Sequence, residues 1–295
     1  MSDRPDTDAF DVETASAAVE RVESEIGERI VGQETVVRQL LVCLLTGGNA
    51  LVEGIPGLGK TLLIRTLAEA IDLSFARIQN TPDLMPSDIT GTEVLRESGD
   101  DRVFVFEEGP VFANVVLADE INRATPKTQA ALLEAMAEGQ VTAGGETRAL
   151  PEPFFVLATQ NPIDQEGTYP LPEAQRDRFE MKITITPPSF DEELAIVDRY
   201  TGTIDPAPPV ETVLTGDELR AIQALVRQVP IADDIRERAV RLVADTRTAD
   251  RLEYGASPRA SMALVVGAKA HALVDGRPYV GEADLRRDLA RFDDA

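Results

Sequence analysis

The chain has 295 residues, of which 52 are acidic and 29 are basic, giving a formal net charge of −23. So acidic a surface repels nucleic acid and anionic lipid, which argues against either as a partner. Hydrophobic residues make up 43% of the chain, which is enough for a hydrophobic core. No apolar stretch is long enough to span a membrane, and the N-terminal residues are polar and acidic. We therefore expect a cytoplasmic protein without membrane insertion.

The acidic residues are spread along the chain rather than gathered in one tail. They serve either a basic partner or solubility in high salt, and the even spread favours the second, a protein from a salt-loving organism. Cys43 is the only cysteine and His271 the only histidine, so a transition-metal site is not expected.

In chain order, two expected helices precede an alternation of buried strands and helices. The first helices are expected at 12–28 and 33–45. The strands are expected at 49–53, 73–78, 114–120, 154–162 and 181–185, with helices at 62–71 and 126–139. Continuous apolar strands alternating with helices predict an α/β fold, a parallel five-stranded core sheet covered on both faces.

Three segments interrupt this alternation. Residues 82–94 are a turn-rich insertion, 102–112 alternate like a hairpin arm with a Gly-Pro turn, and 139–150 read as a hairpin around A-G-G-E. After Pro187-Pro188 the strand signal vanishes. Amphipathic helices are expected at 191–200, 216–228, 233–247, 258–273 and 282–291. The chain therefore divides into an α/β core at 1–187 and an all-helical domain at 188–295.

The loop E-G-I-P-G-L-G-K-T fits the phosphate-binding pattern G-x-x-x-x-G-K-[ST]. It lies between a predicted strand and a predicted helix, where glycines let the backbone approach phosphates and helix N–H groups point at the anion. Lys60 would reach the outer phosphates of ATP and Thr61 would ligate Mg²⁺. An ordinary Gly/Pro turn is the alternative, and the agreement of both flanks favours nucleotide. The predicted binding residues are Gly54, Ile55, Pro56, Gly57, Leu58, Gly59, Lys60, Thr61 and Leu62.

Two further strand ends carry polar residues that suit phosphate hydrolysis. The third strand ends L-A-D-E, where Asp119 can hold magnesium and Glu120 can polarise the attacking water. The alternative is that the pair caps the next helix. The fourth strand ends A-T-Q-N-P, where Asn161 could hydrogen-bond the water and the terminal phosphate. An Asn-Pro turn is a serious alternative for Asn161 considered alone.

Two arginines, Arg176 and Arg178, stand just before the fifth strand, at the far end of the preceding helix. They would have to fold back to reach Lys60 of their own chain. In a ring, this edge would face the neighbour's nucleotide, where an arginine neutralises charge that develops during hydrolysis. A surface salt bridge is the alternative for each.

Six ordered motifs resemble the MoxR-type AAA+ ATPases. They are G-I-P-G-L-G-K-T, V-V-L-A-D-E-I-N-R-A, L-L-E-A-M-A-E-G-Q-V-T, A-T-Q-N-P, G-T-Y-P-L-P-E-A-Q-R-D-R-F and Y-G-A-S-P-R-A, within residues 12–280. The resemblance implies an αβα AAA+ P-loop domain with a helix-2 insert at about 82–112, a helical lid, and a ring that is usually a hexamer.

The same resemblance assigns roles to residues. Lys60 and Thr61 belong to the phosphate loop, Asp119 and Glu120 serve magnesium and the water, and Asn161 is the first sensor. Arg178 matches the arginine finger that acts on the neighbouring subunit, and Arg259 matches the second sensor, a lid arginine that touches the terminal phosphate. Val31 and Gly32 match the segment beside the adenine.

The sequence departs from the family pattern at three places. Asn80 replaces an aromatic residue, which is expected to change how the insert packs. Arg176 replaces an apolar residue; it is either a second contact to the neighbour's nucleotide or, as we favour, a partner for Asp177. After R-P-Y-V the family continues further than residues 280–295 do, so a short lid with weaker hydrolysis and ring formation is expected.

Together these features predict an Mg-dependent ATP hydrolase that remodels client protein complexes in a chaperone-like ring. The resemblance adds a possible partner that contains a von Willebrand factor A domain. A nucleic-acid motor of the same superfamily is one alternative, and the net charge argues against it. An ATP-binding switch or scaffold with little hydrolysis is the other.

Overall fold

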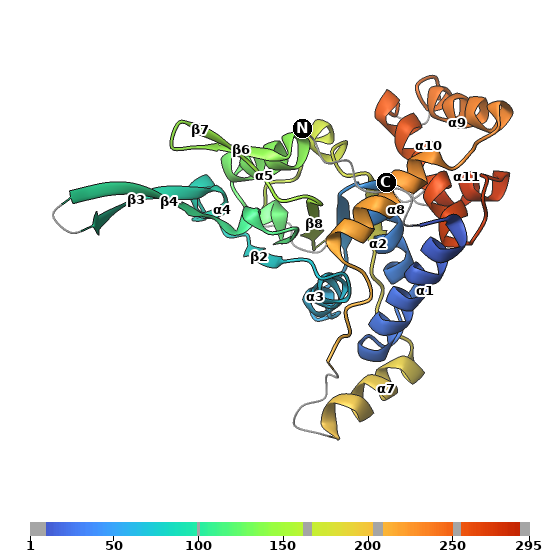
Figure 1. The fold of residues 1–295 in the computed structure, drawn as a ribbon, viewed down its shortest axis with the longest axis horizontal. Helices are drawn as coiled ribbons and strands as arrows, with labels where there is room; N and C mark the ends of the chain where they lie inside the picture. Colours follow the sequence, from blue (N-terminus) through green and yellow to red (C-terminus); the bar gives the residue numbers. More distant parts are fainter. Residues whose placement is uncertain (1–9, 99–100, 162–166, 203–208, 250–254, 290–295) are drawn as a thin grey trace.

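The computed structural model of the protein describes residues 10–98, 101–161, 167–202, 209–249 and 255–289 (Figure 1). Its centre is a five-stranded parallel sheet in the order β2-β5-β8-β1-β9, as the sequence predicts. The strands are β1 (Ala50–Glu53), β2 (Phe75–Gln79), β5 (Val115–Asp119), β8 (Phe155–Gln160) and β9 (Met181–Thr184).

Both faces of the sheet are buried because the two sets of alternating side chains enter two different cores. In β5, Val115 and Leu117 join one core and Val116 and Ala118 join the other. The first core also contains side chains of α1 (Val12–Arg29), α2 (Glu34–Thr46) and α3 (Lys60–Ala70). The second contains side chains of α5 (Pro126–Glu138). This two-sided burial explains why the strands read as continuous apolar runs.

The α5 helix has the ends that its sequence predicts. Thr125 accepts the Thr128 N–H at its start, Pro126 occupies the first turn, and Gly139 ends it in a left-handed conformation. The predicted hairpin follows as β6 (Gln140–Ala143) and β7 (Glu146–Ala149), joined through Gly144 and Gly145, which both have positive φ.

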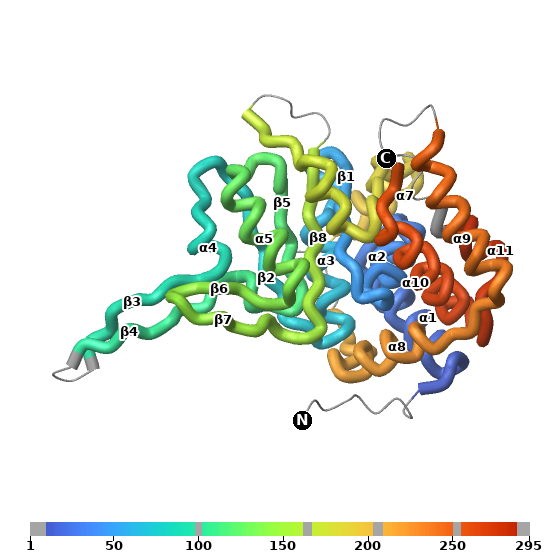
Figure 2. The backbone as a smooth tube through the Cα atoms, turned by 90° about the horizontal axis from the view of Figure 1, so that it is seen from above, coloured from blue at the N-terminus to red at the C-terminus, as the bar shows by residue number. Residues whose placement is uncertain are grey.

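The helix-2 insert is more regular than predicted. It contains a short α4 (Pro86–Thr90) and two antiparallel strands, β3 (Gly91–Ser98) and β4 (Asp101–Glu108), which we call the insert ribbon. The ribbon extends away from the sheet (Figures 1 and 2). The arm expected at 102–112 is therefore present, but Gly109-Pro110 is not its turn: Pro110 starts the 3-10 helix Pro110–Phe112.

The helices expected after residue 187 are present, each within two residues of its predicted ends where these are described. They are α7 (Phe190–Thr201), α8 (Gly216–Gln228), α9 (Asp233–Thr246), α10 (Pro258–Val274) and α11 (Glu282–Leu289). The first core continues from the sheet through α1 and α2 into α8 and α10, so the division near residue 188 stays a prediction. No helix in the described ranges is long and apolar enough to cross a membrane.

Candidate active site

The phosphate loop has the backbone that anion binding requires. Gly57 and Gly59 have φ of 89° and 73°, in the left-handed region that favours glycine. A Cβ on Gly54 would lie 2.9 Å from the Ile185 carbonyl oxygen, so the loop passes close to the end of β9. Helix α3 starts at Lys60 without any side-chain cap, which leaves its first N–H groups available to an anion.

Lys60 lies across this loop. Its Nζ donates to the Gly54 carbonyl oxygen at 2.7 Å. Burial lowers the pKa of Lys60, while the charges of Asp119 and Glu120 act in the opposite direction. The ammonium group is therefore close enough to both carboxylates for their charges to act on it. A buried charge is costly unless it is paired, and a nucleotide phosphate would be the negative partner of Lys60.

Asp119 ends β5 and is fixed from two neighbouring strands. Its Oδ1 accepts a hydrogen bond from the hydroxyl of Thr159 in β8 at 2.6 Å. Its Oδ2 accepts one from Nε of Arg77 in β2 at 3.2 Å. The carboxylate is 13% exposed. The acid that the sequence assigns to magnesium is thus held rigidly at the carboxyl edge of the sheet, where parallel α/β sheets bind ligands.

Glu120 follows in a left-handed backbone conformation, with φ of 54°. Its N–H donates to the Thr159 hydroxyl oxygen at 2.9 Å. Its Oε2 accepts Gln79 Nε2 at 3.0 Å and is 3.3 Å from Nη1 of Arg123. Glu120 is the N-cap residue of the 3-10 helix Ile121–Arg123, but its side chain makes no capping hydrogen bond, so capping does not occupy its carboxylate.

The two asparagines near these acids are both buried. Asn80 is 1% exposed and its Nδ2 donates to the Asp119 carbonyl oxygen at 2.9 Å. At the position where the resemblance leads us to expect an aromatic residue, Asn80 thus provides a bond that joins the end of β2 to β5. Asn161 is 7% exposed and directly follows β8, which places it at the same sheet edge as Asp119.

Val31 and Gly32 lie at this end of the sheet too. They precede α2, and Gln33 Nε2 donates to the carbonyl oxygen of Thr186, the neighbour of Ile185. With residues of α1, α2 and α7 they line a pocket of about 740 Å³. The Glu192 carboxylate of α7 lies against Gly32, where a Cβ would come within 2.5 Å of its Oε1.

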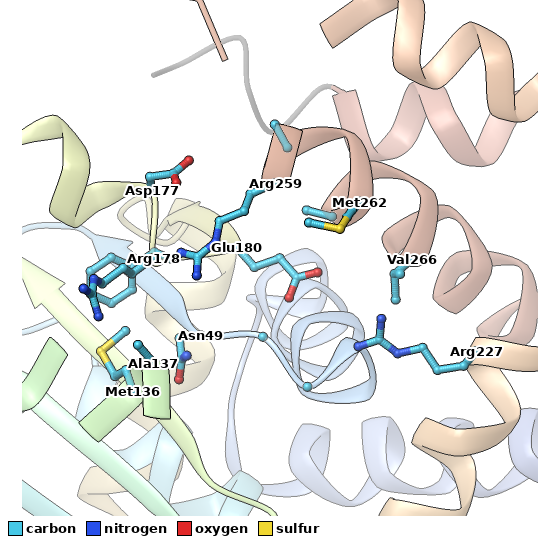
Figure 3. A pocket seen from close by; sticks show the side chains of 15 residues that line it. Asn49, Met136, Ala137, Asp177, Arg178, Glu180, Arg227, Arg259, Met262 and Val266 are labelled. Carbon is cyan, nitrogen blue, oxygen red and sulfur yellow. The ribbon is translucent and has the colours of Figure 1, made fainter. Parts of the chain in front are cut away.

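Arg178 and Arg259 lie together in a different place, which we call the arginine pocket (Figure 3). Both line a cavity of about 380 Å³ with Gly47, Gly48 and Asn49, which precede β1. The phosphate loop follows the other end of β1. Four strand residues at about 3.3 Å each separate the two ends by about 13 Å, so neither arginine lies at the phosphate loop of its own chain.

Each arginine has a defined support. Arg178 Nη1 donates to the Leu133 carbonyl oxygen of α5 at 2.7 Å. Arg259 lies in the first turn of α10, whose N-cap Ser257 donates its hydroxyl to Asp177 Oδ1 at 2.8 Å. The expected ion pair between Arg176 and Asp177 is wrong, since the described interactions give Asp177 this serine partner instead and leave Arg176 exposed.

The geometry above is that of an ATPase of the AAA class, and the comparisons agree. Residues 49–181 match the ATPase family associated with various cellular activities (AAA), and residues 244–289 match the AAA lid domain. A candidate ATPase from Cytophaga hutchinsonii, solved as a crystal structure, superposes with a TM-score of 0.87. It is 41% identical, and the match covers 94% of this chain and 86% of that one.

Relatives give the family within this class. The chaperone MoxR1 of Mycobacterium tuberculosis is 45% identical over 276 residues, covering 90% of this chain and 72% of its own. The protein MoxR of Methylorubrum extorquens is 33% identical, and the match covers 91% of this chain and 84% of that protein. YeaC of Bacillus subtilis, an uncharacterised protein, is 45% identical, with 88% and 81% covered. The chain belongs to the MoxR family of AAA+ ATPases.

Proposed function

We propose that this protein binds ATP with Mg²⁺ at residues 54–62 and hydrolyses it to ADP and phosphate. The observation that carries the proposal is the pair Asp119 and Glu120, fixed by one threonine hydroxyl at the sheet edge that also carries Lys60. This arrangement supports the proposal, because an acid suited to the metal, an acid suited to the attacking water and the cation of the phosphate loop share one edge.

The residues present fit a magnesium ion. Asp119 is an oxygen donor held by hydrogen bonds at the strand end, and Thr61 stands in the first turn of α3; oxygen ligands are those that Mg²⁺ prefers. Bound there, the ion would offset the negative charge of the phosphate oxygens. Lys60, released from the Gly54 carbonyl, would bind the outer phosphates.

Glu120 is the base in this proposal. It would accept a proton from the attacking water, while Asn161 would orient that water and the terminal phosphate. Gln79 and Arg123 contact Glu120 Oε2, so the carboxylate must exchange one of these partners for the water. Val31 and Gly32 would border the adenine.

Hydrolysis requires a second copy of the chain. Arg178 and Arg259 lie together at the opposite end of β1 from the phosphate loop, so we infer that both contact the terminal phosphate bound by a neighbouring copy. A head-to-tail contact of this kind gives a ring when the rotation between copies closes, and the family resemblance implies a closed ring, usually a hexamer.

The work done by this ring would be remodelling or maturation of client protein complexes in the cytoplasm. A relative of 45% identity is named a chaperone, which supports the proposal. A partner with a von Willebrand factor A domain fits the same role. The net charge of −23 disfavours nucleic acid as the client.

The test is phosphate release measured in mixtures of two inactive variants, Glu120→Gln and Arg178→Ala. Each alone is expected to lose at least about 100-fold of the wild-type rate. Mixed in equal amounts, they should regain activity, because an intact Glu120 site then meets an intact Arg178 from the other chain. Arg236→Ala, an exposed arginine of α9, is the control and should keep the wild-type rate.

The wild-type specific rate should also climb with protein concentration. If the mixture stays inactive while the wild type hydrolyses ATP, Arg178 does not act between chains. If the wild type binds ATP but releases no phosphate at any concentration, the protein is a nucleotide-dependent switch or scaffold.

A further inference from the structure

Helix α7 presents an apolar stripe that the described residues of its own chain leave exposed. Phe190, Leu194 and Val197 are 80%, 50% and 49% exposed. They stand at i, i+4 and i+7, so they share one face of the helix. The opposite face is the one that packs: Glu192 lies against Gly32, and Arg199 donates to the Glu28 carbonyl oxygen at 2.9 Å.

The borders of this α7 stripe are acidic. Asp191, Glu193 and Asp198 are all exposed on the same helix. Single exposed apolar residues need no explanation, but three in a row with an acidic border are typical of a docking surface. Its partner should combine an apolar floor with positive charge.

The arginine pocket has this chemistry. Met136, Met262 and Val266 line it, together with Arg178, Arg227 and Arg259 (Figure 3). Met262 is 61% exposed. Methionine side chains adapt their shape to an apolar partner, and the three arginines of the lining outnumber its two acids, Asp177 and Glu180.

The two surfaces lie at opposite ends of the sheet. Arg178 and Glu180 lie just before β9, at the end where the strand starts. Helix α7 starts at Phe190, six residues after the last residue of β9. The stripe and the pocket of one chain are therefore separated by at least the length of β9, about 13 Å. Contact between them joins two different copies.

We infer that the α7 stripe of one copy docks against the Met136, Met262 and Val266 wall of the arginine pocket of the next copy. The inference rests on the proposed function, in which Arg178 of one copy serves the nucleotide of another. Ile185, five residues before the start of α7, lies against Gly54 of the phosphate loop. A neighbour that brings Arg178 to this loop therefore brings its apolar wall to α7.

The contact makes α7 part of the subunit interface and gives the ring a direction. Because the stripe and the pocket are different surfaces, every copy uses its stripe on one neighbour and its pocket on the other. Charge complementarity would orient the approach, and the apolar side chains would hold the pair together.

Cross-linking of two mixed variants, each with one added cysteine, tests this geometry. Leu194→Cys and Met262→Cys are prepared separately, mixed with Mg²⁺ and a non-hydrolysable ATP analogue, and treated with a short bismaleimide. We expect a cross-linked dimer in the mixture and not in either variant alone. Wild type controls for Cys43, which is buried, and Val240→Cys on α9, 50% exposed, replaces Leu194→Cys as the matched control.

A second measurement uses the triple variant F190S/L194S/V197S. These side chains are exposed, so unfolding temperature should not fall, and binding of a fluorescent ATP analogue by the dilute protein should be kept. Assembly measured by sedimentation should need at least about tenfold more protein than in the wild type. The specific ATPase rate should fall with it and recover at high concentration.

Three results would overturn the inference. They are normal assembly of the triple variant, absence of product in the Leu194→Cys and Met262→Cys mixture, and an equally strong product in the Val240→Cys control. Formation of the cross-link between Leu194→Cys and Met262→Cys, together with a wild type that neither binds nor hydrolyses ATP, would instead refute the proposed function and leave the docking surface in place.

Discussion

Thr159 connects the two acids on which the proposed chemistry depends. Its hydroxyl donates to Asp119 Oδ1 at 2.6 Å and accepts the Glu120 N–H at 2.9 Å. The residue is 1% exposed, so water does not replace these bonds easily. The hydroxyl thus holds Glu120 in a left-handed conformation that a non-glycine residue rarely adopts.

Replacing this hydroxyl should reduce turnover while leaving ATP binding intact. In Thr159→Val the shape is kept but both bonds are lost, so Asp119 and Glu120 lose their shared support. We expect kcat to fall about 10- to 100-fold, with the dissociation constant for ATP changed less than about threefold. Steady-state phosphate release and equilibrium titration with a fluorescent ATP analogue measure the two effects.

Two further variants decide whether the hydroxyl is responsible. Thr159→Ser keeps it and should recover most of kcat. Thr142→Val, on the exposed face of β6, should match the wild type. A Thr159→Val protein with normal kcat would show that the carboxylates are positioned without this residue.

The sequence predicts the acids but not their supports. Asp119 and Glu120 stand out because two carboxylates follow an apolar strand. Thr159 and Arg77 become neighbours of Asp119 only because β2 and β8 flank β5, and strand order is a long-range property. The parallel register that pairs Ala118 with Ala158 would have identified Thr159 once the strand order was known.

At the scale of elements, the base of the insert ribbon depends on two glycines packed against each other. A Cβ at Gly109 would lie 2.2 Å from the Ile89 carbonyl oxygen and 2.5 Å from the Gly91 N. Both contacts are backbone atoms, which cannot move aside as a side chain can. Gly109 has φ of −84°, so it is close approach and not conformation that requires glycine here.

Gly109→Ala should therefore loosen the ribbon. We expect the free energy of unfolding to fall by about 1–3 kcal/mol and amide exchange to accelerate in β3 and β4. Gly27→Ala is the matched control, because a Cβ there meets nothing within 4 Å inside α1; it should raise stability by about 0.5–1 kcal/mol. Unchanged exchange in the ribbon of Gly109→Ala would contradict the packing argument.

Sequence patterns predict most elements because the amphipathic helices bury one face and the core strands bury both. The helices show apolar residues at helical spacing and the core strands show unbroken apolar runs. Strand β3 was missed because its T-E-V-L-R-E-S sequence has charged residues on both sides of a protruding ribbon, where no core imposes an alternation. Its partner β4 contains V-F-V-F, which carries a strand signal of its own.

At the scale of the whole molecule, the position of α10 was not predictable. Its sequence gives a helix, and its contacts place that helix on α1 and α2, which in turn sets Arg259 beside Arg178. Such packing between distant segments leaves no local signature. The motif S-P-R-A identifies the arginine, while only the structure shows that it lies at the opposite end of β1 from the phosphate loop.

The net charge of the molecule predicts how its stability depends on salt. With 52 acidic and 29 basic residues, the excess acids repel one another more in the compact state than in the unfolded chain. The screening length falls from about 10 Å at 0.1 M salt to about 3 Å at 1 M. We therefore expect the unfolding temperature to rise by several degrees between 0.1 and 1 M KCl, as measured by circular dichroism.

This measurement separates two effects of KCl, which are the screening of surface charges and the exclusion of the salt from the protein surface. Sucrose, which strengthens burial without screening charge, serves as the control at equal osmolality. Screening predicts that KCl stabilises more than sucrose and that the gain flattens once the screening length falls below the spacing of surface charges. A temperature that stays constant or falls in KCl would show that the acidic surface is not a source of instability, and that its charge serves a basic partner instead.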